Sequence, residues 1–325
     1  MTTAAPQVAD SSATAAPRRV LALVRRARVH RVLWQLTKGT SITAFKYRIT
    51  GLAAEAAFWA LLSLPPLILG LISSAGYLRG AFGESTVNEL SLWIKNKSGT
   101  FLTQDAVNNV VAPMVDEVLN KKHIEILSLG FLISLWAGSR ALSVYVDTIS
   151  IAYGLDGVRG VIRARLKSFF LYIVGLLVAV VVIPMLIAGP QLVRAWIPGS
   201  AHFVSMLYWP VVVTLSIFFL SLLYHLSVPV RTAWWRETPG AVLALVFWIA
   251  GSVILREYLS GTVSGVSATA SLAAPIAVMA WLYVTAFAVL VGACLNAEID
   301  RLWPAGETSA ARAKAQLECQ VKNLG

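Results

Sequence analysis

The chain has 325 residues, of which 57% are hydrophobic and only 13% are charged, and its mean hydropathy is +0.71. Because soluble proteins carry about 25% charged residues, this composition excludes a water-soluble enzyme and predicts an all-α, polytopic membrane protein. The net charge of +11 does not indicate nucleic-acid binding, because the basic residues flank the apolar segments, where membrane topology accounts for them.

The first 50 residues precede the apolar segments and divide into two parts. Residues 1–17 are rich in Ala, Ser, Thr and Pro; they predict a disordered tail and lack the pattern of a cleaved signal peptide. Residues 18–50 form a basic segment, since Arg18–Arg48 contains nine Lys and Arg residues and no acid. We expect this segment to lie against anionic lipids at the cytoplasmic face; a nucleic-acid or partner site is the alternative.

Six apolar segments predict a six-helix transmembrane domain over residues 51–300. The expected spans are about 52–78, 124–146, 168–189, 205–228, 240–258 and 271–298. In the hydrophilic stretch 79–123, apolar residues at helical spacing predict an extracytoplasmic amphipathic helix between the first two spans. Thr238 followed by Pro239 predicts the start of the fifth helix. Residues 301–325 form a polar tail, either a short helix or disordered.

The distribution of basic residues orients these spans. If both termini are cytoplasmic, twenty Lys and Arg residues lie inside and seven lie outside. Since Lys and Arg concentrate in cytoplasmic segments, we expect a multi-pass protein of the inner or plasma membrane with both termini in the cytoplasm. The oligomeric state stays open.

Charged residues inside the spans are the candidate functional groups, since each costs about 2.5–3.5 kcal/mol at membrane depth. Glu55 lies near the start of the first span and Arg140 near the end of the second, which runs the opposite way. Their depths therefore match and predict an ion pair, with Asp147 as a competing partner. Such a pair either fixes the register of two helices or belongs to a substrate or proton site; snorkelling towards the lipid surface is a third reading.

The first span places further groups beside Glu55. Trp59 and Ser63 follow it at i+4 and i+8 and therefore share its helix face. Pro65 and Pro66 predict that the helix kinks or breaks there, because proline removes a backbone donor and clashes with the carbonyl four residues earlier. A carboxylate beside a broken helix is typical of transporter binding sites. The predicted substrate-binding residues are Glu55, Trp59, Ser63, Arg140 and Asp147.

The last span ends in a polar cluster near the expected inner interface, formed by Asn296 and Glu298. Packing and interfacial solvation are sufficient to explain these two side chains, and a functional role is the alternative. Ala288 and Gly292, four residues apart, predict that another helix approaches this part of the span closely.

The sequence contains no catalytic or cofactor-binding motif. A phosphate-binding loop, a dinucleotide-binding glycine pattern and the G-x-S-x-G pattern are all absent. Two cysteines and four scattered histidines exclude a disulfide framework and a zinc-type ligand spacing. We therefore expect no enzymatic activity, no metal and no cofactor.

Four segments together resemble the YihY/BrkB-type inner-membrane proteins. They are LAAEAAFWALLSLPPLILG (Leu52–Gly70), LWAGSRALSVYVDTISIAYG (Leu135–Gly154), PVRTAWWRETPGAVLALVFW (Pro229–Trp248) and WLYVTAFAVLVGACLNAEIDR (Trp281–Arg301). The resemblance covers roughly residues 40–303 and implies six transmembrane helices, cytoplasmic termini, and links to serum resistance and envelope lipid traffic. An older label of the family, ribonuclease BN, is treated as misassigned because this sequence supplies no nuclease metal site.

Two positions depart from the family pattern. Cys294 stands where many members carry a glutamate in the last helix, and Ala270 replaces a glycine just before that helix. The first departure shifts the expected functional carboxylate to Glu55. The leading hypothesis is a transporter or flippase-like protein for a lipid or amphiphile; a non-transporting envelope scaffold is the alternative, followed by a membrane-bound enzyme.

Overall fold

A computed structural model describes residues 18–77, 124–156, 158, 160–196, 201–230, 232–263 and 270–324. All regular structure in this part of the chain is helical, as predicted. The elements are α1 (Arg18–Lys46), α2 (Ile49–Tyr77), α7 (Ile124–Ala152), α8 (Val161–Trp196), α9 (Ala201–Ser227), the 3-10 turn η2 (Trp234–Glu237), α10 (Thr238–Val263), α11 (Ala270–Leu302) and α12 (Gly306–Leu324). The predicted helix start at Thr238 is confirmed.

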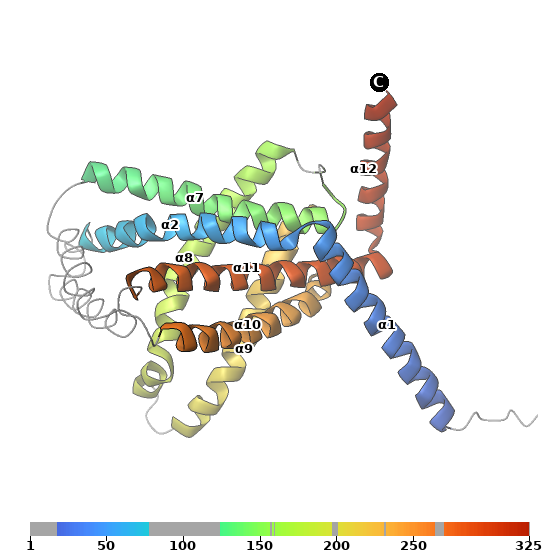
Figure 1. The fold of residues 1–325 in the computed structure, drawn as a ribbon, viewed down its shortest axis with the longest axis horizontal. Helices are drawn as coiled ribbons and strands as arrows, with labels where there is room; N and C mark the ends of the chain where they lie inside the picture. Colours follow the sequence, from blue (N-terminus) through green and yellow to red (C-terminus); the bar gives the residue numbers. More distant parts are fainter. Residues whose placement is uncertain are drawn as a thin grey trace, which may run out of the picture.

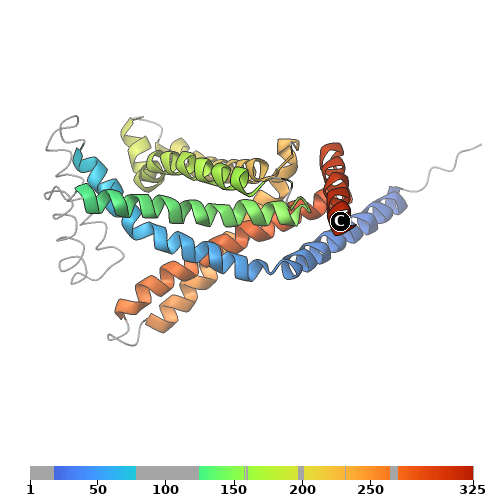
Figure 2. The ribbon, with the colours of Figure 1, turned by 90° about the horizontal axis from the view of Figure 1, so that it is seen from above.

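Four helices, α2, α7, α10 and α11, run along the long axis of the molecule, and α8 and α9 cross them obliquely (Figures 1 and 2). Helix α11 contacts α1, α2, α7 and α10, so it is the central element of the bundle. Helices α1 and α12 join the bundle at one end and project away from it (Figure 1). We call this the α12 end; it is where α7 and α11 finish and where α2 and α10 begin.

Five helical segments are long and apolar enough to cross a membrane: 49–68, 129–152, 208–227, 234–259 and 275–302. They coincide with the first, second, fourth, fifth and sixth predicted spans. The third predicted span lies within α8, which is not one of these five. The predicted tail at 1–17 and the predicted amphipathic helix within 79–123 lie outside the described residues.

Of the predicted kink or break at Pro65 and Pro66, the break is wrong, because α2 continues through both prolines as one α-helix. The φ angle that proline imposes is compatible with a helix. The prolines therefore reduce the stability of the helix only through the missing backbone donors and through local clashes. Helix α7 packs along this part of α2 and supports it. Gly130 faces Pro66, and Gly70 fits so closely against Phe131 that a side chain there would overlap the ring.

Glycines allow α10 and α11 to meet backbone against backbone. Gly240 and Gly292 face each other, and a Cβ atom on either would overlap the carbonyl oxygen of the other. Tyr224 of α9 reaches the same place, where its hydroxyl donates a hydrogen bond to the carbonyl of Val289 at 2.7 Å. The predicted close approach is therefore confirmed at Gly292, and its partner is α10.

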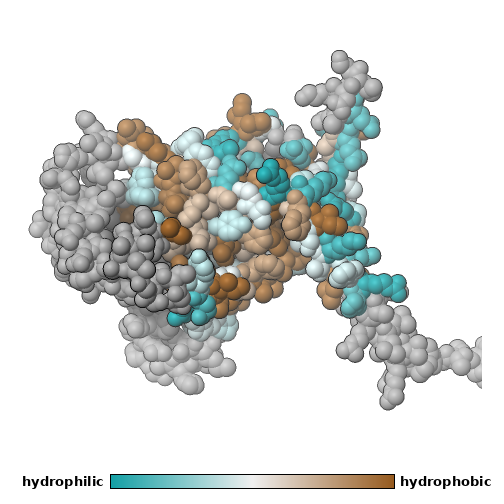
Figure 3. Space-filling model, in the orientation of Figure 1, coloured by the Kyte–Doolittle hydropathy of each residue, from teal (hydrophilic) through white to brown (hydrophobic). Residues whose placement is uncertain are grey.

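The outer surface of the described helices is largely apolar. Large hydrophobic side chains stand exposed along the bundle, for example Phe58, Leu132, Val246 and Ile254. Hydrophilic residues gather along α12 and around its junction with the bundle (Figure 3). This separation is the one expected of a bundle surrounded by lipid with one polar end in water.

Candidate functional site

The ion pair predicted between the first two spans is present. Helices α2 and α7 lie side by side and run in opposite directions (Figures 1 and 2). The Arg140 guanidinium donates a hydrogen bond to Glu55 Oε1 at 3.2 Å. The two side chains are 40% and 38% exposed, so the pair lies at the surface of the bundle rather than in its core.

Aromatic rings flank this pair on both helices. Trp59, one turn after Glu55, meets Trp136, one turn before Arg140, edge to face at 5.3 Å between ring centroids. Ser63 is buried a further turn along α2, and its hydroxyl donates to the carbonyl of Ala60 at 2.8 Å. The predicted face of α2 therefore lies along α7; Glu55 and Trp59 are partly exposed, and Ser63 is buried.

Asp147, the competing partner, lies apart from the ion pair. It is exposed, and the Ser143 hydroxyl donates to its Oδ2 at 3.3 Å. Arg140 and Arg165 are close enough to attract its charge. Of the two predicted partners Glu55 holds the direct contact with Arg140, whereas Asp147 contributes to the surrounding field together with Arg165 of α8.

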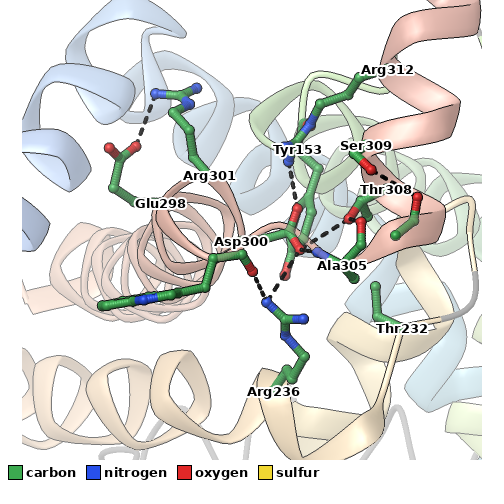
Figure 4. Close-up of polar contacts among 12 residues, drawn as sticks. Tyr153, Thr232, Arg236, Glu298, Asp300, Arg301, Ala305, Thr308, Ser309 and Arg312 are labelled. Carbon is green, nitrogen blue, oxygen red and sulfur yellow. Dashed lines mark hydrogen bonds and ion pairs between the residues drawn. The ribbon is translucent and has the colours of Figure 1, made fainter.

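A second polar region, the α12-end cluster, joins four segments of the chain: the residues after α7, the chain before α10, α11 and α12 (Figure 4). Its members are Tyr153, Thr232, Arg236, Glu237, Asn296, Asp300, Thr308 and Arg312. Glu237 is 1% exposed and accepts hydrogen bonds from Tyr153 at 2.7 Å and Thr232 at 3.0 Å. Burial raises the pKa of the Tyr153 hydroxyl, so Tyr153 stays protonated and remains a donor.

Asp300 is the centre of this cluster. Arg312 of α12 donates to its Oδ2 at 2.6 Å, and the Arg236 guanidinium lies 3.6 Å from its Oδ1 (Figure 4). The Thr308 hydroxyl and the backbone amide of Ala305 donate to the same Oδ1. One buried carboxylate therefore fastens α12 and the chain before α10 to the end of α11.

The side chain of Asn296 forms hydrogen bonds with backbone groups at the start of α10. Its side-chain oxygen accepts from the Gly240 amide at 2.7 Å, and its side-chain nitrogen donates to the Glu237 carbonyl at 2.9 Å. Glu298 pairs with Arg301 at 2.9 Å and lies against Gly39 of α1, where a side chain would overlap it. Both predicted residues therefore make packing contacts between helices.

Sequence reasoning did not identify most of the α12-end cluster. Tyr153, Glu237 and Arg312 are separated by 84 and 75 positions along the chain, so no local spacing connects them. The available signal was an acid beside the start of the fifth helix, since Glu237 directly precedes Thr238. An acid that close to an apolar span needs a partner, and the structure supplies Tyr153 and Thr232.

The described residues contain no group of three or more His, Cys, Asp or Glu side chains that could hold a metal ion. Cys294 is a free thiol buried in the apolar core. The arrangement offers charge pairing and hydrogen bonding at two depths of the bundle.

Comparison with known proteins confirms the resemblance drawn from the four segments. A relative, the putative ribonuclease-like protein YfkH of Bacillus subtilis (strain 168), is 26% identical over 256 residues, which are 77% of this chain and 89% of the relative. No solved structure matches the chain. The family model described as virulence factor BrkB matches residues 44–317, which include both polar regions, and the chain therefore belongs to the BrkB family.

Proposed function

We propose that this protein is a transporter or flippase-like protein that moves a lipid or other amphiphile across the inner membrane. The observation that carries the proposal is the accessible Glu55–Arg140 pair within two candidate spans. Burying an ion pair is costly and an exposed pair contributes little to stability, so stability alone does not explain charges at this depth. This pair instead stands where a molecule moving along the bundle surface can reach it.

The chemistry of the pair suits a lipid head group. Arg140 can bind a phosphate through two parallel hydrogen bonds, and Glu55 neutralises it when no substrate is present. Exchange of Glu55 for a phosphate keeps the guanidinium paired throughout, and the released Glu55 carboxylate, which is 38% exposed, is then hydrated or takes up a proton. Trp59 and Trp136 provide flat apolar surfaces for the adjoining part of an amphiphile.

The proposal includes the orientation and the number of spans. Helix α8 contains the third of the six proposed spans. The α12 end faces the cytoplasm, because it carries most of the basic residues. The Glu55–Arg140 pair then lies towards the inner leaflet. Anionic lipids of that leaflet are the expected membrane partners of the basic segment in α1.

The test is lipid movement in vesicles that contain the purified full-length protein. Fluorescent phospholipid in the inner leaflet is protected from a membrane-impermeant quencher until it is moved outwards. We expect the wild type to expose it, and we expect Glu55→Gln and Arg140→Gln each to slow exposure at least tenfold. Arg256→Gln, which removes an exposed arginine of α10, is the matched control and should leave the rate unchanged.

Two results would overturn this proposal. If both site variants moved lipid as fast as the wild type, the Glu55–Arg140 pair would not be the site. If the wild type moved no lipid, the envelope scaffold would become the leading reading. The name of the YfkH relative raises RNA cleavage as a further alternative; incubation of the same purified protein with RNA tests it directly.

A further inference from the structure

Helix α8 carries two buried hydrogen-bond donors that the described part of the chain does not use. They are Nη1 of Arg165 and the hydroxyl of Tyr172, and neither has a hydrogen-bond partner among the described residues. The two residues are seven positions apart, so they lie about two turns apart on the same face of α8. Because a buried donor without a partner costs free energy, a bound molecule or water has to supply the acceptors.

The contacts of Tyr172 place its hydroxyl beside the Glu55–Arg140 pair. Tyr172 packs so closely on Gly138, two residues before Arg140 in α7, that a Cβ atom at Gly138 would overlap the Tyr172 ring. The hydroxyl also lies near Ser63, which follows Glu55 by eight residues in α2. Since α2 begins and α7 finishes at the α12 end, the hydroxyl lies farther from that end than the ion pair does.

Arg165 lies among charges of both signs. Its charge interacts with those of Arg140 and Asp147 of α7, and Asp156 lies near Asp147. Glu55 contacts Arg140 directly, whereas the attraction between Arg165 and Asp147 leaves Nη1 of Arg165 without a hydrogen bond. The region therefore contains carboxylates as well as cations. Arg165 is distinguished by an unused donor and not by an excess of positive charge.

We infer that α8 completes the substrate site and that this site binds a glycerophospholipid through its phosphate and an ester carbonyl. Arg165 shares the phosphate with Arg140, since the planar guanidinium fork matches phosphate oxygens. Tyr172 donates to an ester carbonyl of the same lipid, which lies deeper in the membrane than the phosphate. Arg165 and Tyr172 are partly exposed, so a lipid beside the bundle can reach both side chains. The inference rests on the proposed function for identifying the Glu55–Arg140 pair as the substrate site.

The experiment measures binding of phosphatidylglycerol to the purified full-length protein in detergent, by native mass spectrometry. Arg165→Gln should weaken binding about tenfold, which is the lower end of the effect of one hydrogen bond to a charged group. Arg163→Gln removes an exposed arginine two residues away on α8 and is the matched control. It should change binding much less, because it removes the same charge from the helix without removing the proposed contact.

A second comparison tests Tyr172. Tyr172→Phe removes only the hydroxyl and should weaken binding of the diacyl lipid about fivefold, the net effect of one ordinary hydrogen bond. The dialkyl ether analogue of phosphatidylglycerol has the same head group and lacks the ester carbonyls, so the substitution should leave its binding unchanged. Because the hydroxyl has no partner among the described residues, Tyr172→Phe should unfold at the wild-type temperature.

Several outcomes would overturn the inference. Equal weakening by Arg163→Gln and Arg165→Gln would show that binding responds to the overall charge of α8. Unchanged binding in Arg165→Gln and Tyr172→Phe would show that water alone satisfies the two donors. Equal effects of Tyr172→Phe on the diacyl and dialkyl lipids would exclude the ester contact. Inorganic phosphate that bound as tightly as the lipid would assign the site to a free anion.

The inference and the transport proposal can fail separately, because these measurements record binding and not movement. A protein that binds lipid through Arg165 and Tyr172 but moves none in vesicles would refute the transport proposal alone. A wild type that moves lipid, with Arg165→Gln and Tyr172→Phe variants that bind it equally well, would refute the inference alone.

Discussion

The two polar regions of this protein are built in opposite ways. In the α12-end cluster, Asp300 is 3% exposed and accepts from Arg312, Thr308 and the Ala305 amide, with Arg236 close by. In the other region one hydrogen bond of 3.2 Å joins Glu55 to Arg140, and both side chains are well exposed. The first region is saturated with internal partners, whereas the second can still accept a partner from outside.

This difference indicates that the α12-end cluster stabilises the fold, whereas the Glu55–Arg140 pair can exchange its partners. A buried carboxylate with several donors is expensive to disturb, since each donor left behind is itself partly buried. If the proposed pathway admits water to the half-exposed pair, the pair contributes little to stability, because solvent screens it and both side chains lose rotamer freedom. The α12-end cluster should therefore control folding, and the Glu55–Arg140 pair should control activity.

The largest stability effect should follow from Asp300→Ala. It leaves Arg236 and Arg312 without their carboxylate and should destabilise the protein by about 3–5 kcal/mol. Thermal unfolding of the detergent-solubilised protein measures the loss. Glu307→Gln, which removes an exposed acid of α12, is the control. A midpoint within one degree of the wild type for Asp300→Ala would show that the cluster does not hold α12.

A smaller loss is expected for Tyr153→Phe, which keeps the ring and removes the donor to Glu237. Hydrogen bonds to charged groups contribute about 1.5–3 kcal/mol, so a loss of about 2 kcal/mol is expected in the same assay. Tyr283→Phe changes a partly buried ring outside the cluster and should alter stability much less. Equal effects of the two substitutions would contradict the role given to Tyr153.

The Tyr153 hydroxyl should also make the free energy of unfolding depend on pH. Burial and the neighbouring Glu237 raise the pKa of Tyr153 above its ordinary value of 10.0. The unfolded state therefore loses this proton first, and stability should fall as pH rises above about 10, with a slope of about 1.4 kcal/mol per pH unit. The difference between the wild type and Tyr153→Phe isolates this contribution. Parallel pH profiles of the two proteins would exclude it.

The smallest stability effect should come from Glu55→Gln and Arg140→Gln. An exposed ion pair contributes at most about 1 kcal/mol, so the unfolding midpoints should stay near the wild-type value. These two variants are the ones expected to lose lipid movement. If the Glu55→Gln and Arg140→Gln variants were as unstable as Asp300→Ala, the two regions would not differ in this way, and the Glu55–Arg140 pair would be a structural element.

Contacts could be predicted from the sequence where they depended on one helix or on two neighbouring helices. The Glu55–Arg140 pair followed from depth in two antiparallel spans, and the close approach at Gly292 from residue size. The helix break at Pro65 was wrong because packing against α7 supports a helix that local preference disfavours. The α12-end cluster was missed because its side chains meet only after four segments of the chain have folded together.

The contact between Gly240 and Gly292 has a mechanical consequence. With no side chain between the two backbones, and with Asn296 bonded to the first turn of α10, these helices cannot slide past one another without breaking both features. We therefore expect helices α10 and α11 to move as one rigid body. In the proposed transport, we expect helices to slide between this pair and the pair formed by α2 and α7.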